Sequence, residues 1–144
     1  MFATFDGFKM LACYFPQLKE KGIFFERCSQ LSATHRGQPF ILVGDLNTGN
    51  QAIDRTERGT KYSCPEGFDR LCQLDGLIDL WRQTNGSTQE WTWLSNGGNG
   101  FRIDHALAST EFLNRWKPVC SYDHSTRNTG LSDHSALIIE VGKT

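Results

Sequence analysis

Four short segments carry polar side chains of the kinds that do acid–base or metal chemistry, and each lies at the end of an apolar run. They are Cys13-Tyr14-Phe15-Pro16-Gln17, Gly44-Asp45-Leu46-Asn47, Phe101-Arg102-Ile103-Asp104-His105 and Leu131-Ser132-Asp133-His134-Ser135. Asp45 and Asn47 are two residues apart, so in an extended stretch both side chains project to one side. His134 carries an imidazole, whose ordinary pKa of about 6.5 suits proton transfer near neutrality, and a carboxylate can fix its tautomer.

These groups can take part in proton transfer and can bind a metal ion. Each segment taken singly has a simpler interpretation, because an Asp or Asn after a strand usually satisfies a turn. The four segments taken together, in this order, are what indicates chemistry.

The apolar runs predict an α/β protein with a mixed sheet. Strands are predicted over residues 8–15, 40–44, 91–94, 101–108 and 135–141. Helices are predicted over residues 19–36 and 65–76. Between them lie the predicted strand 40–44 and a long polar loop over residues 45–63. In the first helix, five residues at three- and four-residue spacing predict the buried face: Ile23, Phe24, Arg27, Cys28 and Leu31. Open α/β sheets place ligands where strands end, as these polar segments do.

Length and composition narrow the class of protein. The chain has 144 residues, 38% of them hydrophobic and 22% charged, which indicates one folded domain and excludes a disordered, collagen-like or coiled-coil chain. The net charge of -1 argues against a strongly basic nucleic-acid binder, so a site for a polyanion must be a local patch. No apolar stretch is long enough to span a bilayer, and we expect a cytoplasmic protein. The five cysteines form no C-x-x-C pair and are expected to be free thiols.

The motifs YFPQ, GDLN, RID and SDH, in this order, resemble the endonuclease/exonuclease/phosphatase superfamily and most of all its exonuclease III and abasic-site endonuclease branch. The resemblance runs from about Phe8 to the C-terminus. It implies a DNase I-like, four-layer α/β sandwich with two face-to-face mixed sheets and outer helices, of which residues 1–144 would form the C-terminal part. It also implies phosphodiester hydrolysis that depends on Mg²⁺ or Mn²⁺.

The resemblance carries roles onto the matching residues. Asp45 becomes a general base or acid, and Asn47 binds phosphate or positions the water. Asp104 becomes the carboxylate partner of His134, which acts near neutrality. Tyr14 donates to the phosphate, and Asp133 lies at the metal site.

Four further residues are assigned to substrate binding by the same likeness: Gln17, Trp93, Phe101 and Ile103. The last three are similar to residues that line a pocket for a flipped-out sugar in abasic endonucleases. The alternative is that these apolar side chains only fill the core.

Other polar residues are expected to be structural. Arg102 is interpreted as a structural residue despite its place in a motif, and no family motif falls on His35, His105 or His124. The loop after GDLN holds three basic residues that either contact a nucleic-acid backbone or form a solvated loop: Arg55, Arg58 and Lys61.

The likeness also predicts what the chain lacks. In the superfamily, the first half brings an early Asn and a Glu, often within a Q-E pair, that holds the magnesium. The one Q-E pair here is Gln89-Glu90, which precedes the predicted strand 91–94. We therefore expect an N-terminal half to be missing, magnesium to bind weakly, and the chain to self-associate as a possible homodimer.

Three functions follow from these observations. The first is a metal-dependent DNA nuclease acting at abasic sites or 3′ ends. The second is a phosphatase or lipid phosphodiesterase of the same superfamily, acting on inositol phosphates or sphingomyelin. The third is a catalytically inactive fragment that only binds a partner or nucleic acid.

Overall fold

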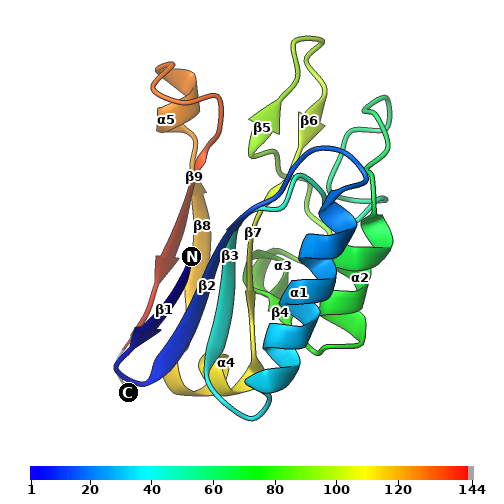
Figure 1. Ribbon diagram of the computed structural model, residues 1–144. Helices are drawn as coiled ribbons and strands as arrows, with labels where there is room; N and C mark the ends of the chain where they lie inside the picture. The colour runs from blue at the N-terminus through cyan, green and yellow to red at the C-terminus, as the bar shows by residue number, and fades with distance from the viewer. Residues whose placement is uncertain (143–144) are drawn as a thin grey trace.

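A five-stranded mixed sheet forms the centre of the protein, whose computed structural model describes residues 1–142 (Figure 1). Its strands are β1 (Phe2–Phe5), β2 (Phe8–Tyr14), β3 (Phe40–Asp45), β7 (Asp104–Ala108) and β4 (Ile78–Asp79), in the spatial order β1-β2-β3-β7-β4. The β2 and β3 strands are parallel and the other neighbours are antiparallel. The predicted α/β class with a mixed sheet is confirmed.

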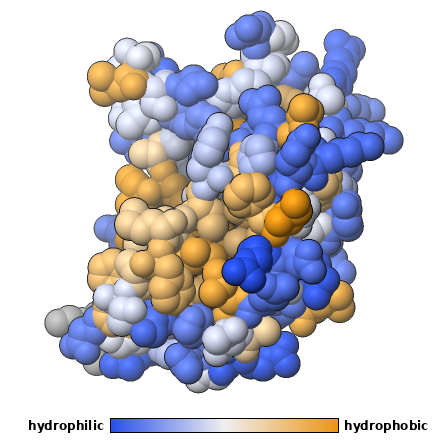
Figure 2. Space-filling model, viewed as in Figure 1, coloured by the Kyte–Doolittle hydropathy of each residue, from blue (hydrophilic) through white to orange (hydrophobic). Residues whose placement is uncertain are grey.

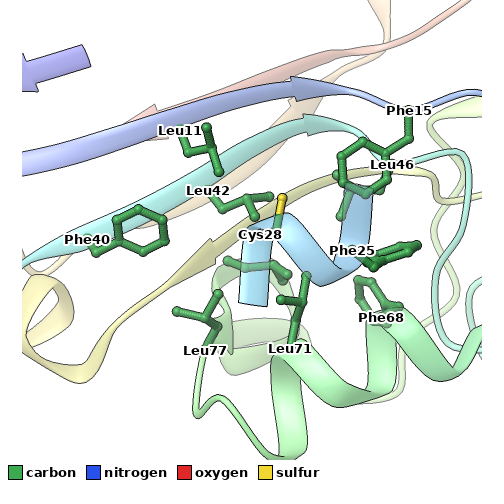
Figure 3. Packing of buried hydrophobic residues seen from close by; sticks show 11 residues of the cluster. Leu11, Phe15, Phe25, Cys28, Phe40, Leu42, Leu46, Phe68, Leu71 and Leu77 are labelled. Atoms are coloured by element: carbon green, nitrogen blue, oxygen red, sulfur yellow. The ribbon is translucent and has the colours of Figure 1, made fainter. Parts of the chain in front are cut away.

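One face of this sheet is covered by two helices, α1 (Lys21–Thr34) and α2 (Pro65–Gln73) (Figure 1). Leu42 of β3 and Leu107 of β7 are completely buried beneath them, together with Leu71 of α2. Figure 3 shows Leu42 and Leu71 packed near Phe25 and Phe68, which come from the two helices. This apolar layer fixes the helices against the sheet.

The other face is covered by smaller elements. They are α3 (Leu80–Asn85), α4 (Thr110–Trp116) and a two-stranded sheet of β8 (Val119–Asp123) and β9 (Ala136–Glu140). The hairpin of β5 (Trp93–Leu94) and β6 (Gly100–Phe101) and the short helix α5 (Ser125–Asn128) lie at one end of the sheet, beyond the ends of β3 and β2 (Figure 1). The main sheet and the elements packed on its two faces position the site, which lies at the end of the sheet near β5, β6 and α5.

The predicted face of the first helix is wrong at Ile23, Phe24 and Arg27, which are exposed, and is confirmed at Cys28 and Leu31, which belong to or pack against the core. Ile23 and Phe24 are 69% and 46% exposed, whereas Phe25 and Cys28 are buried. The buried residues of α1 are Lys21, Phe25, Cys28, Ser29 and Ser32, which also follow helical spacing. A pattern of apolar residues could not reveal this face, because three of its five members are polar.

One predicted strand is interrupted in the structure, and two strands of the structure were not predicted. The expected strand 101–108 is interrupted, since β6 ends at Phe101 and β7 begins at Asp104. The sequence analysis missed β1, although Asp6-Gly7 is a two-residue hairpin turn in which Gly7 has a positive φ of 97°. Strand β8 was also not predicted.

A buried ion network explains the interruption between β6 and β7. The Arg102 guanidinium is completely buried and binds Asp54 of the loop (Nε–Oδ1, 2.7 Å) and Asp79 before α3 (Nη2–Oδ2, 2.6 Å). Arg82 of α3 adds a second guanidinium on Asp54. The Arg102 backbone N–H also donates to the Asp54 carbonyl at 2.7 Å, so it leaves the strand ladder to bind the loop.

The charges in this network are mutually stabilised. Burial alone would raise the pKa of Asp54, but the charge and hydrogen bonds of Arg102 hold it below its ordinary value. Burial opposes ionisation of Asp79 as well, and His105 and Arg102 lower the pKa of that carboxyl. Arg102 is therefore structural, as the sequence analysis expected.

An apolar surface remains on the side of the molecule where β1 and β9 lie, visible as the orange area of Figure 2. Phe2 and Phe5 of β1 are each 44% exposed, and Val119 and Ile138 are exposed on the small sheet. In addition, β1 is an edge strand, and β9 pairs with β8 alone among the described residues. Exposed apolar strands with unpaired edges favour association.

Among residues 1–142, no helix has the length and apolarity needed to cross a membrane.

We predict that replacing Arg102 with Met destabilises the fold by about 3–5 kcal/mol near neutral pH, because it strands two buried carboxylates. The carboxyl pKa values are lowered in the folded state, so their stabilisation is present above the ordinary Asp pKa and lost as the pH falls. The difference between wild type and variant should therefore shrink only when the pH falls below about 4, the ordinary Asp pKa. Urea unfolding near neutral pH and near about pH 3 measures it. Exposed Arg36→Met is the matched control and should change stability by less than about 0.5 kcal/mol. A pH-independent difference would contradict the ionic account.

We also predict that a second copy of the chain covers the apolar surface in solution. Sedimentation velocity over a concentration series should show dimers or larger species, and Ile138→Lys should shift the distribution to the monomer, because it places a charge on the exposed apolar strand. Ile23→Lys, on the exposed side of α1, is the control and should have no effect. A wild-type chain that stays monomeric throughout would refute this prediction.

Candidate active site

Strand register brings three predicted residues side by side at one end of the main sheet. Asp45 ends β3, and it is paired with Tyr14 of parallel β2 and with Asp104 of antiparallel β7. Neighbouring strands lie about 4.8 Å apart, so the three side chains share one edge of the sheet. The segments YFPQ, GDLN and RID therefore meet because of the way β3 pairs with its two neighbours.

A tight turn after β3 sets the geometry of the GDLN segment. Gly44 has a φ of 137°, and a Cβ there would lie 1.9 Å from the Cys13 carbonyl oxygen, so only glycine fits. Asn47 has a left-handed φ of 48°, a conformation that Asn tolerates better than most residues. The Asn47 backbone N–H donates to Asp45 Oδ1 at 2.7 Å, and its side-chain amide donates to the Phe15 carbonyl at 2.8 Å and to Asp45 Oδ2 at 3.1 Å.

The SDH segment brings His134 to the same edge. A bridge between Trp93 and His134, together with a hydrogen bond from the Ser135 N–H to the Thr92 carbonyl, holds the segment beside β5. His134 Nδ1 lies 2.8 Å from Asp104 Oδ2, the partner that the sequence analysis predicted for it. Because Nδ1 is engaged by Asp104, Nε2 is the nitrogen positioned to exchange a proton with a bound ligand.

The local charges shift two pKa values. The hydrogen bond to Asp104 raises the pKa of His134 above its ordinary value, which favours the imidazolium form near neutrality. Burial raises the pKa of Asp45, and the nearby Asp104 carboxylate acts in the same direction against the Asn47 N–H. A carboxylate whose pKa is raised is a better proton acceptor than an ordinary one.

Asp45, Asp104 and His134 form one compact group whose potential ligand atoms all lie within 4.8 Å of one another. The two carboxylates of this group offer hard oxygen ligands that suit Mg²⁺ or Mn²⁺. His134, held by Asp104 and favouring its imidazolium form, is not counted among the ligands. Asp133 lies outside this group, on an exposed rim where its Oδ2 accepts a 3.2 Å hydrogen bond from the Trp93 indole.

A cleft of about 790 Å³ contains every residue that the sequence analysis assigned to the site. These ten lining residues are Tyr14, Gln17, Asp45, Asn47, Trp93, Phe101, Ile103, Asp104, Asp133 and His134. Phe101 and Ile103 are mostly buried, so they form an apolar wall, and Trp93 lies against Phe101 with ring centroids 5.6 Å apart. Tyr14 is 73% exposed and points a phenol toward solvent in the cleft.

The basic loop residues separate into two kinds. Arg55 donates to the backbone carbonyls of Thr56, Glu57 and Gly59, so it holds its own loop together. Lys61 lines the cleft, where an ammonium can reach a polyanionic ligand.

The three histidines other than His134 lie outside the compact group described above: His35, His105 and His124.

The sequence analysis missed three buried charged residues. Asp54 and Asp79 bind Arg102, and Lys21 lies beneath the turn at Asn47, to whose carbonyl its Nζ donates at 2.6 Å. Each is a polar residue with a partner 23 to 48 positions away. The spacing of hydrophobic residues therefore gives no signal for these three residues, and none of them lies in one of the four motifs.

Comparison with solved structures shows the same fold. The 3′ phosphatase NExo from Neisseria, solved with a product DNA hairpin, has a TM-score of 0.84 over 98% of this chain and 22% identity. An AP endonuclease from Archaeoglobus fulgidus has a TM-score of 0.79 over 97% of this chain and 21% identity. This chain covers 63% of each of those proteins. The DNase I-like fold class is thereby confirmed.

Comparison of sequences gives the family. The DNA repair nuclease APEX1 of Danio rerio is 28% identical over 116 residues, which cover 71% of this chain and 36% of APEX1. The chain thus spans about a third of that relative's length. The model of the Endonuclease/Exonuclease/phosphatase family matches residues 29–134, a range that contains the GDLN, RID and SDH motifs. The resemblance drawn from those motifs is confirmed, and the chain belongs to the endonuclease/exonuclease/phosphatase family.

Proposed function

We propose that this chain carries the proton-transfer and phosphate-binding part of a divalent-metal-dependent phosphodiesterase that acts on DNA at abasic sites or 3′ ends. The observation that supports it most is the compact Asp45, Asp104 and His134 group at the wall of a cleft of about 790 Å³. The proteins it is similar to are described as a DNA repair nuclease, an AP endonuclease and a 3′ phosphatase. DNA is therefore the proposed substrate and partner.

The residues divide the work as follows. Asp45, with its raised pKa, takes a proton from the attacking water. Both N–H groups of the Asn47 side chain are donated to Phe15 and Asp45, so its Oδ1 accepts a hydrogen bond from that water and orients it. The His134 imidazolium, fixed by Asp104, faces the developing negative charge on the phosphoryl group. Tyr14 donates its phenol proton to a phosphate oxygen in a hydrogen bond.

A Mg²⁺ or Mn²⁺ ion, when bound, would neutralise phosphoryl charge and help the leaving oxygen depart. We propose that Asp133, which lines the same cleft as Asp45, supplies a carboxylate ligand. Few protein oxygens are available to such an ion, so we expect weak binding in this chain alone.

The apolar wall supports DNA over a small phosphate ester. Trp93, Phe101 and Ile103 give one side of the cleft an apolar surface that suits a sugar lacking its base, or a stacked base. A phosphatase or lipid phosphodiesterase activity is the alternative, because the same polar group would hydrolyse any phosphate ester that fits. A chain that binds DNA without turnover would support the third reading, an inactive fragment.

We predict cleavage or 3′ trimming of duplex DNA with an abasic site or a 3′ phosphate, at a low rate in the isolated chain, and loss of activity when EDTA removes the metal. The panel should include plain duplex and inositol phosphates. Hydrolysis of the inositol phosphates alone would favour the phosphatase reading. DNA binding that weakens with salt, with no product in Mg²⁺ or Mn²⁺, would contradict the proposed activity.

In an active preparation, His134→Ala should lower turnover at least about a hundredfold, the usual contribution of a general acid–base group, with little change in DNA binding. His35→Ala is the matched control. Its ring stacks on Phe2 and Phe40 at the opposite end of the strands, so turnover should hold. Steady-state kinetics and DNA binding measured on both variants decide the point. A loss confined to KM in His134→Ala would give this residue a binding role instead.

A further inference from the structure

Lys21, the first residue of α1, is completely buried, which is rare for a lysine without a partner. Its Nζ donates a 2.6 Å hydrogen bond to the backbone carbonyl of Asn47. The bond joins the N-terminus of a helix to the turn that follows β3, across 26 positions of sequence. Lys21 does not line the cleft, so it does not contact a ligand held there.

The partner of Lys21 is a strained turn. Asn47 is one of three described non-glycine residues with a positive φ, and its backbone N–H and side-chain amide are both engaged by Asp45. A left-handed conformation is unfavourable for most residues other than glycine, although Asn tolerates it better, so the contacts around Asn47 help to hold it. The Lys21 ammonium holds the Asn47 carbonyl and so constrains the ψ angle of Asn47, while Asp45 holds the Asn47 N–H and its side-chain amide.

Burying the charged ammonium of Lys21 has an electrostatic cost. Burial lowers the pKa of Lys21, and the Cys64 thiol and the Asp45 carboxylate act in the opposite direction. A buried methionine of similar length would pack in the same space without these costs. Retention of a cationic donor under the turn therefore needs a reason other than packing, and orientation of Asn47 supplies one.

We propose that Lys21 is a positioning residue: by holding the Asn47 carbonyl it keeps Asn47 in its left-handed conformation, so that Oδ1 of the Asn47 side chain meets the attacking water at a fixed angle. This rests on the proposed phosphodiesterase function, since Asn47 acts on the substrate only there. Lys21 itself touches neither substrate nor metal.

Two substitutions separate positioning from packing. Lys21→Met removes the donor and keeps the length and apolar volume, and Lys21→Arg keeps a donor. In an active preparation Lys21→Met should lower kcat about ten- to a hundredfold with KM nearly unchanged, since small misplacements of a catalytic group cost that much. Lys21→Arg should recover most of the loss. Exposed Lys19→Met, two positions earlier, is the control and should match wild type.

A double-mutant cycle tests the route of the effect. If Lys21 acts through Asn47, then Lys21→Met should add little to the loss caused by Asn47→Ala, because both remove one function. Fully additive losses would show that Lys21 acts elsewhere and would overturn the proposal.

A measurement without turnover separates this inference from the proposed function. The side-chain amide resonances of Asn47, identified by their disappearance in Asn47→Ala, should shift or broaden in Lys21→Met and stay near their wild-type positions in Lys21→Arg and Lys19→Met. Unchanged Asn47 signals in Lys21→Met, with only a lower Tm, would reduce Lys21 to a packing residue. If no substrate is turned over, the proposed function fails while the Asn47 signals still decide the role of Lys21.

Discussion

The rest of the structure depends on one constraint, the need to pair the Arg102 guanidinium inside the protein. A buried charge without partners is costly, so the loop that carries Asp54 and the chain before α3 that carries Asp79 must both converge on it. Arg102 stands two residues before Asp104, and its backbone N–H is bound to the Asp54 carbonyl. The ion network therefore joins the long loop after GDLN to the segment before β7. It fixes Asp104 as the first residue of that strand.

Strand register then converts this anchorage into a site. Asp104 stands opposite Asp45, and Asp45 stands beside Tyr14, so a slip of one residue in either pairing would send these side chains to the other face. Gly44 permits the close contact with the Cys13 carbonyl that this register demands. The two carboxylates so placed repel each other, and His134 offsets part of that repulsion. A divalent cation would offset more, which is why the same geometry that raises the Asp45 pKa also suits a metal.

The sequence predicted the cleft better than it predicted the fold around it. The motif residues end up along one cleft because each motif is a strand end, and strand ends gather at one edge of a sheet. The helix face was only partly right because Lys21, Ser29 and Ser32 are buried, and no hydrophobicity pattern counts them as core. Asp54 and Asp79 escaped notice for a related reason: their meaning depends on Arg102, which only the folded chain brings to them. Buried charges can be recognised only from the contacts that folding creates, whereas the residues that line the cleft can be recognised from sequence motifs.

The apolar surface and the cleft occupy different parts of the main sheet. Phe5 pairs with Phe8 at the start of β2, whereas Tyr14 ends that strand at the cleft, six residues further on. At about 3.3 Å per residue, Phe8 lies roughly 20 Å from Tyr14 along the strand, and Leu11, the partner of Phe2, lies roughly 10 Å from it. A second copy of the chain, or any partner that buries the exposed phenylalanines of β1, can therefore dock there without entering the cleft. Association through that surface would stabilise β1 and β2, and because β2 pairs with β3 up to Asp45, the added rigidity would reach the site through the strand ladder.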